Sequence, residues 1–404
     1  MQNTTSFVPR IIVVLFLIAT IVASSWYAYP LLTKEEPSAI TFYYSGPLSL
    51  DSTELSVNSV KLALEKHHYS AGGMPVKLVV LDDGDKTGAW TEHGEQRVVN
   101  IAATDPTTVA YIGPLNSGAA KISMPVLNKQ GIVQISPSAT WPGLTKSGFL
   151  PGEPGIFYPT GIPHFVRVAA TDDLQGPSGA QWAHELGFTS VYVVNDKDPY
   201  GVGIADLFQH EAERIGMSVV GSESVSPESA VYVPVAARIL AAKPDLVYYG
   251  GLTADGGPEL LKYIREHGSQ AAFMGPDGIF EQEFISKAGT SSEGVYMTAI
   301  GAPPEEVKTP TAEAFIQTYK NKFHASPDVF GALAYDATNA LLDAIDRVHS
   351  NDRAAILHEV KNIHKQPGVF ATWGFDERGD TSLTLISGSI VKRGNILFEK
   401  VLSK

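Results

Sequence analysis

Small hydroxyl side chains follow several apolar, strand-like runs of the sequence. Ser117 follows one such run, and Ser138 and Thr140 follow the next. Ser117 also opens a predicted helix, where free backbone N–H groups and the helix dipole attract an anion. Asp277, at the end of a later run, supplies the opposite charge. These residue types suit a small zwitterion, because neutral donors hold its carboxylate while one acid holds its ammonium.

Ordinary structural roles compete for each of these residues. Ser and Thr are favoured helix caps, and an Asp after a strand is a common turn residue. Taken singly, each residue is better explained in that way. Their occurrence at successive strand ends favours a ligand site, because ligands of doubly wound sheets bind at the carboxyl ends of the strands.

Strand-like and helical runs alternate along most of the chain, which is typical of a doubly wound α/β fold. A Gly- and Pro-rich interruption at 142–163 separates a first series of alternating runs from a second. Helical runs dominate 311–363, and a final β region is predicted at 372–401. The length of 404 residues is too great for one ordinary core and predicts two lobes.

The N-terminal segment is unlike the rest of the chain. No charged residue lies between Arg10 and Lys34, and the stretch is strongly aliphatic. This pattern is typical of a signal peptide or a membrane anchor. Small residues at 22–24 offer a poor cleavage site, whereas residues 11–32 are long enough to span ~30 Å of hydrocarbon. We favour an anchor, and either interpretation places the remaining chain outside the cytoplasmic membrane.

Composition and motifs exclude several classes of function. The net charge of −13 argues against nucleic acid as a partner. The absence of cysteine excludes disulfides, thiolate metal sites and thiol nucleophiles. The acidic stretch at 82–85 lacks the spacing of a calcium loop, and no catalytic Ser elbow, zinc-binding His pair or phosphate loop is present. We therefore expect no metal, no cofactor and no enzymatic activity.

An ordered series of motifs resembles the branched-chain amino-acid (Leu/Ile/Val) binding proteins of bacterial ABC importers. The series is "GPLNSG", "QISPSAT", "DKDPYG", "DLVYYGG" and "FMGPDG", followed by "WGFDERGD" near the end. The resemblance extends from about Ile40 to the C-terminus. It implies a type I periplasmic-binding-protein fold, in which two Rossmann-like lobes joined by three crossovers close on a ligand.

The resemblance also implies roles for individual residues. Ser117 and Thr140 would hold the α-carboxylate of the ligand by their side chains, and Ser138 would do so by its backbone. Asp277 stands where the family commonly has Glu, which accepts the α-ammonium. Tyr200 would face the ligand from the second lobe.

Four further positions match the walls of the family's pocket. Leu115 and Phe330 match apolar positions, whereas Leu252 and Asp51 stand where aromatic residues are common. Asp51 leaves open a ligand with a polar side chain, an amide or a second amine. It is equally well explained as part of the N-terminal cap of the helix predicted near Thr53.

The resemblance finally implies a division of the chain and a function. Residues 1–37 would be the signal or anchor segment and linker, 38–167 with 301–371 the first lobe, and 168–300 with 372–404 the second. The expected function is capture of a small amino acid and its delivery to the membrane permease of an ABC importer. Binding of short amides, urea or a polar amino acid, or a ligand-sensing ectodomain, remain as alternatives.

Overall fold

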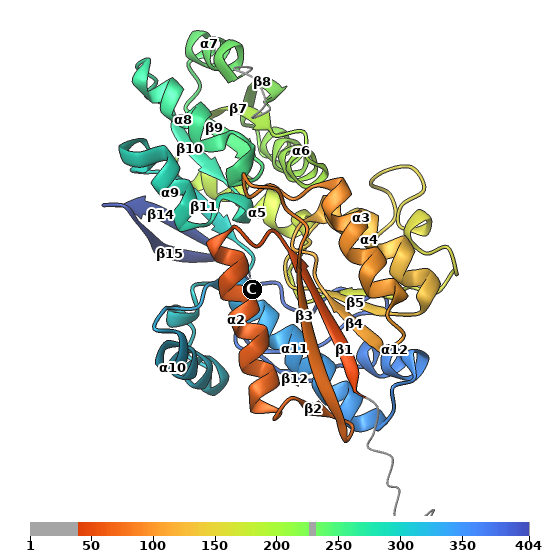
Figure 1. Ribbon diagram of the computed structural model, residues 1–404. Coiled ribbons are helices and arrows are strands. Elements are labelled where there is room, and N and C mark those ends of the chain that lie inside the picture. Colours follow the sequence, from red (N-terminus) through yellow and green to blue (C-terminus); the bar gives the residue numbers. More distant parts are fainter. Residues whose placement is uncertain (1–38, 226–231, 404) are drawn as a thin grey trace, which may run out of the picture. The chain divides into compact units, whose positions relative to one another are not determined.

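The computed structural model describes residues 39–225 and 232–403 (Figure 1). The predicted signal or anchor segment at 11–32 lies outside these residues. Within the described ranges, every helix is too short or too polar to cross a membrane.

A six-stranded sheet, called the first sheet below, is built from the N-terminal part of the described chain. Its strand order is β2-β3-β1-β4-β5-β6. Apart from the short hairpin between β2 and β3, its strands pair in parallel. The strands are β1 (Ile40–Gly46), β2 (Ser70–Ala71), β3 (Met74–Asp82), β4 (Thr108–Ile112), β5 (Val133–Ser136) and β6 (Phe165–Arg167).

Helices from two distant parts of the sequence pack against the first sheet. Three of them alternate with its strands, namely α2 (Asp51–Lys66), α3 (Glu92–Thr104) and α4 (Ser117–Gln130). Three more come from near the C-terminus, namely α10 (Pro310–Phe323), α11 (Val329–Val348) and α12 (Arg353–Lys361). α11 contacts α2 closely and shares one apolar core with β1 and β4. The core beneath the first sheet therefore includes a helix, α11, that begins almost 300 positions after β1 in the chain.

A seven-stranded sheet, called the second sheet below, has the order β15-β14-β11-β10-β9-β7-β8. Its parallel strands are β7 (Ser190–Asn195), β8 (Ser218–Ser224), β9 (Leu246–Gly250), β10 (Ala272–Gly275) and β11 (Tyr296–Ala299). β14 (Ile386–Lys392) and β15 (Asn395–Ser403) join in antiparallel orientation. The associated helices are α5 (Asp172–Glu185), α6 (Pro199–Arg214), α7 (Tyr232–Ala242), α8 (Gly257–Glu266) and α9 (Gln282–Ala288).

The apolar runs of the sequence become the central strands because both faces of a parallel sheet are covered by helices. All residues of β1, β4, β5 and β9 are buried, in agreement with this rule. The predicted doubly wound α/β class is thus confirmed. The Gly- and Pro-rich interruption contains two short 3₁₀ turns, and its aromatic residues Phe157 and Tyr158 pack with Trp141 and α4.

Candidate functional site

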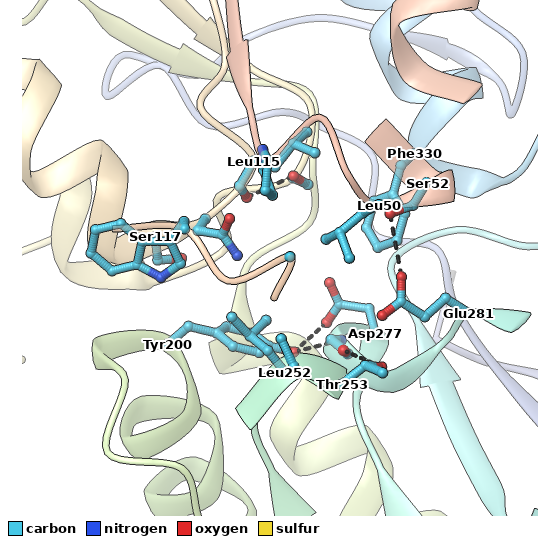
Figure 2. Close-up of a pocket in the computed structure, with 17 residues that line it drawn as sticks. Leu50, Ser52, Leu115, Ser117, Tyr200, Leu252, Thr253, Asp277, Glu281 and Phe330 are labelled. Atoms are coloured by element: carbon cyan, nitrogen blue, oxygen red, sulfur yellow. Dashed lines mark hydrogen bonds between the residues drawn. The ribbon is translucent and has the colours of Figure 1, made fainter. Parts of the chain in front are cut away.

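A cavity lies among loops that follow strands of both sheets (Figure 2). Its empty volume is about 640 Å³, part of which is open to solvent. Its walls comprise Pro47, Leu50, Ser52, Gly88, Trp90, Leu115, Asn116, Ser117, Ser138, Tyr200, Leu252, Thr253, Ala254, Asp277, Gly278, Glu281 and Phe330.

Most residues singled out in the sequence meet at this cavity. Those that line it are Leu115, Ser117, Ser138, Tyr200, Leu252, Asp277 and Phe330. Thr140 is buried and does not line it. Asp51 is exposed as the first residue of α2 and lines a neighbouring pocket instead.

Ser117 is arranged to donate a hydrogen bond into the cavity. It is the first residue of α4, and its Oγ accepts hydrogen bonds from the backbone N–H groups of Thr140 and Trp141, both at 3.1 Å. Because Ser117 Oγ accepts from both amides, its hydroxyl hydrogen is still free to be donated to another acceptor. An anion at the N-terminus of α4 is such an acceptor.

The loop that carries Ser138 and Thr140 is fixed by its own hydrogen bonds. Ser138 Oγ donates to the backbone oxygen of Leu115 at 2.7 Å, and the Ser138 N–H donates to Ser136 Oγ at 3.3 Å. Thr140 Oγ1 is fully buried and has no hydrogen-bond partner among the described residues. An unpaired buried hydroxyl is costly, so a ligand group that pairs with it would be stabilised.

Arg167 stabilises this loop by hydrogen bonds to its backbone. Its side chain is fully buried at the end of β6, and its guanidinium donates to the backbone oxygens of Ala139 at 3.0 Å and Trp141 at 2.7 Å. Asp380 accepts from Arg167 Nε at 2.8 Å and balances the charge. Sequence reasoning missed this residue, although an arginine inside an apolar run was a visible indication of a buried, paired cation.

The Asp277 carboxylate is the acceptor on the second-sheet side. Its Oδ1 accepts from the Tyr200 hydroxyl at 2.7 Å, and that hydroxyl accepts from the Gly278 N–H at 3.0 Å. Burial raises the pKa of Asp277 to about 6, while the bond from Tyr200 partly offsets this rise. Among the described residues, no hydrogen bond reaches its other oxygen, Oδ2, which remains available to a cationic ligand group.

A second carboxyl group, Asp172, lies fully buried behind the cavity at the start of α5. Neither of its oxygens has a hydrogen-bond partner among the described residues. Burial, and then the negative charge of Asp277, raise the pKa of Asp172 well above its ordinary value. Burial of this kind favours the protonated, uncharged form of the acid. Sequence reasoning missed it, although two acids directly follow the strand-like run.

Two hydrogen bonds join the first-sheet and second-sheet sides at the cavity. Trp90 Nε1 donates to Asp198 Oδ2 at 2.8 Å. Ser52 Oγ donates to Glu281 Oε2 at 3.3 Å (Figure 2). Since all four residues come from different loops or helix starts, these bonds depend on the mutual position of the two sides.

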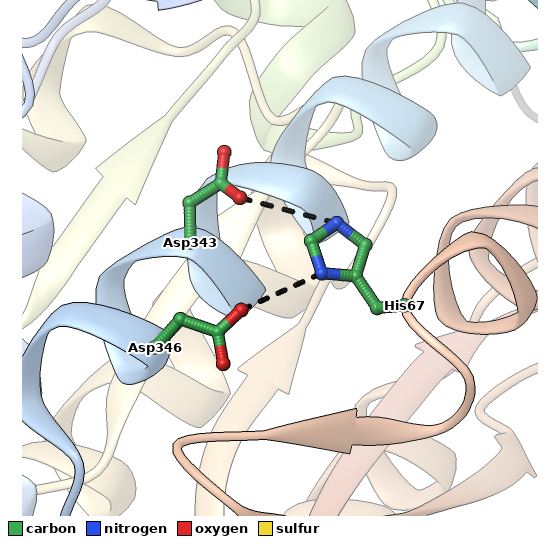
Figure 3. Close-up of side chains that lie close together, drawn as sticks. All are labelled: His67, Asp343 and Asp346. Atoms are coloured by element: carbon green, nitrogen blue, oxygen red, sulfur yellow. Dashed lines mark ion pairs between the residues drawn. The ribbon is translucent and has the colours of Figure 1, made fainter.

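A separate cluster of His67, Asp343 and Asp346 has side-chain atoms of the kinds that can bind a metal ion (Figure 3). The two carboxylates face different nitrogens of the same ring, with Asp343 3.9 Å from Nε2 and Asp346 3.7 Å from Nδ1. The acids also accept hydrogen bonds from Gln366 and from the Gly72 N–H. Because the ligand atoms face opposite sides of one imidazole, the cluster is better explained as a link between the end of α2 and α11.

Known proteins resemble the chain over most of its length. The Leu/Ile/Val-binding protein homolog 3 of Brucella melitensis is 28% identical over 77% of this chain and 80% of its own. The leucine-, isoleucine-, valine-, threonine-, and alanine-binding protein of Pseudomonas aeruginosa is 25% identical over 79% of this chain and 80% of its own.

Solved structures share the fold. The leucine-binding protein of Thermotoga maritima has a TM-score of 0.79 at 24% identity, covering 90% of this chain and 98% of its own. A branched-chain amino acid transporter substrate-binding protein of Streptococcus pneumoniae, in complex with isoleucine, has a TM-score of 0.77 at 21% identity, covering 91% and 100%. A family model described as periplasmic binding protein matches residues 39–384. The chain therefore belongs to the periplasmic binding protein family.

Proposed function

We propose that the protein is the extracytoplasmic solute-binding protein of an ABC importer and captures a small α-amino acid of the branched-chain type. The observation that carries this proposal is the polarity of the cavity. Ser117 offers a hydroxyl donor at a helix N-terminus, Asp277 offers a carboxylate from the other sheet, and apolar side chains lie around them. The names of the relatives support the same ligand class.

The two ends of the cavity suit the two charges of an amino acid. Ser117 would hold the α-carboxylate on the first-sheet side. Asp277 would accept the α-ammonium directly on the second-sheet side. Hydrogen bonds to charged groups contribute about 1.5–3 kcal/mol each, so both ends together fix the ligand's orientation.

Capture would depend on two lobes, formed by 38–167 with 301–371 and by 168–300 with 372–404. Ser117 and Ser138 would bind first, and Tyr200 and Asp277 would complete the cage when the lobes close. The bonds Trp90–Asp198 and Ser52–Glu281 support a closed form, because each joins the two sides. Hinges that absorb such closure usually comprise a few residues.

Delivery would follow from recognition of the closed form by the importer's membrane permease. The N-terminal segment would place the chain outside the cytoplasmic membrane, either as a cleaved signal or as the anchor favoured above. Mass spectrometry of the native N-terminus distinguishes these two cases.

A ligand screen tests the proposal. The melting temperature of the purified full chain is measured with L-leucine, L-isoleucine and L-valine, with leucine methyl ester, with 4-methylpentanoate, and with urea and acetamide. We expect a rise with the free amino acids and none with the ester or the deaminated acid, because each of these lacks one charged end. A rise with urea or acetamide alone would refute the proposal.

A further inference from the structure

The cavity contains more negative charge than an aliphatic amino acid can use. Two carboxylates, Asp277 and Glu281, are among its lining residues, and the described part of the chain contributes no Lys, Arg or His to that lining. An aliphatic ligand brings a single ammonium group. If Asp277 accepts that ammonium, the Glu281 carboxylate is left for a different donor.

Glu281 is directed toward the cavity and does not serve its own helix. It is the N-cap residue of α9 with an extended backbone (φ −150°, ψ 156°), yet its side chain makes no capping hydrogen bond. Its Oε2 instead accepts from Ser52 Oγ on α2 at 3.3 Å, across the interface of the two sides. Figure 2 draws its carboxylate facing Asp277, on the side away from Ser117.

The surroundings of Glu281 offer its carboxylate neutral hydroxyl groups and no close cation among the described residues. Burial raises the pKa of Glu281 to about 7 and the negative charge of Glu283 adds to the rise, whereas hydrogen bonds from the hydroxyls of Thr253 and Ser52 act in the opposite direction. Asp328, which caps α11 nearby, is a further buried acid whose pKa Glu281 raises in turn. The neighbouring cation, Lys287, is held by Glu283 in an ion pair at 2.7 Å. A ligand group that donates to Glu281 would therefore meet little competition.

Apolar side chains lie between the two polar ends of the cavity. Leu50, Leu115, Leu252 and Phe330 all line it. Together they suit the methylene stem of a side chain whose tip is polar, in the way that the stems of long polar side chains are buried in proteins.

We propose that Glu281 is a specificity-determining residue, which accepts an N–H donor at the tip of the ligand's side chain. The pocket then takes amino acids with a short apolar stem and a terminal ammonium or amide in addition to aliphatic ones, and binds them more tightly than their aliphatic isosteres. This inference rests on the proposed function. It assigns to Glu281 the polar contact that the sequence had associated with Asp51.

Isosteric ligands isolate the contact with Glu281. Isothermal titration calorimetry on the full chain compares ornithine with norleucine, in which a methyl group replaces the terminal ammonium, and glutamine with glutamate. We expect ornithine or glutamine to bind roughly 10- to 100-fold more tightly than its counterpart, as for a hydrogen bond to a charged group.

Two variants assign the preference to this residue. Glu281→Gln should reduce the preference for ornithine over norleucine at least ten-fold, and Glu281→Leu should bind norleucine more tightly than the wild type does. Glu266→Gln, at an exposed position at the end of α8 and outside the cavity lining, is the control and should keep the wild-type preference.

The outcomes separate this inference from the proposed function. Tight binding of leucine and norleucine, with ornithine and glutamine weaker and Glu281→Leu without effect, would overturn the role of Glu281 and leave the proposed function intact. Absence of binding by every α-amino acid would overturn both. A preference for ornithine that survives in Glu281→Gln would also overturn the assignment, because the donor would then bind elsewhere.

Discussion

Replacement of Asp277 by Asn tests the ammonium end of the site most directly. The change keeps the shape of the side chain, and the amide oxygen can still accept from the Tyr200 hydroxyl, which lies 2.7 Å from Oδ1. The charge is lost, and the hydrogen bond to the ligand's ammonium loses its ionic component. A hydrogen bond to a charged group contributes about 1.5–3 kcal/mol, so we expect the Kd for L-leucine to rise roughly 10- to 100-fold.

The pH dependence of binding gives a second measure of the same contact. An ammonium binds the ionised carboxylate, and the pKa of Asp277 is raised to about 6 by burial. At pH 7.5 nearly all of this carboxyl is ionised, whereas at pH 5 only about one tenth is, so affinity should fall about ten-fold between these values. Asp277→Asn should lack this fall. Leucine is the appropriate ligand because its side chain offers no donor to Glu281, which titrates in a similar range.

Calorimetry across pH 5–7.5 on the wild type, Asp277→Asn and Asp51→Asn checks this prediction. Asp51 is an exposed carboxylate near the cavity but outside its lining, so Asp51→Asn should bind as the wild type does. The assignment of Asp277 is refuted if Asp277→Asn binds leucine within two-fold of the wild type, or if wild-type affinity is the same at pH 5 and pH 7.5.

Three further substitutions address the carboxylate end and the supporting core. Ser117→Ala should weaken leucine binding roughly ten-fold by calorimetry, because the Ser117 side chain lines the cavity at the N-terminus of α4. Arg167→Met should destabilise the fold by about 3 kcal/mol in urea unfolding, since the buried backbone oxygens of Ala139 and Trp141 lose their donor and Asp380 keeps only the more distant Lys146, 3.8 Å away. The stability of Glu95→Gln should be less sensitive to alkaline pH than that of the wild type. Burial raises the pKa of Asp83 to about 7 and that of Glu95 well above its ordinary value, so ionisation of both acids opposes folding as pH rises from about 4 toward 8. Urea midpoints are measured at pH 6 and pH 8 for both proteins. A drop in midpoint between these pH values that is equally large in Glu95→Gln and in the wild type would contradict the prediction.

The sequence revealed the strand-end residues because their position follows from the strands alone. In a parallel sheet the carboxyl ends of neighbouring strands share one edge, so Ser117 after β4 and Ser138 after β5 had to lie close together. The same argument applied to Asp277 after β10. That residues of two different sheets share one cavity was an expectation from the family resemblance, in which two lobes close on a ligand.

The position of Asp51 could not be read in this way, because it depends on where a helix begins. The helix was predicted near Thr53, whereas α2 begins at Asp51 itself. Successive residues of a helix point about 100° apart. Ser52 therefore lines the cavity with Leu50, while Asp51 between them faces solvent and a neighbouring pocket. A shift of two residues in the helix start was enough to misplace the side chain.

The residues that sequence reasoning missed share a different property, which is that their environment comes from remote segments. Glu281 meets Ser52 across 229 positions of sequence, and Arg167 meets Asp380 across 213. No local pattern predicts such pairs, because an acid after a turn looks the same whether it faces water or a partner. The polar ends proposed to bind the common part of every amino acid are thus local features of strand ends. The part of the cavity that distinguishes one side chain from another is assembled from distant segments, so ligand specificity is the property least accessible from sequence and most dependent on the three-dimensional structure.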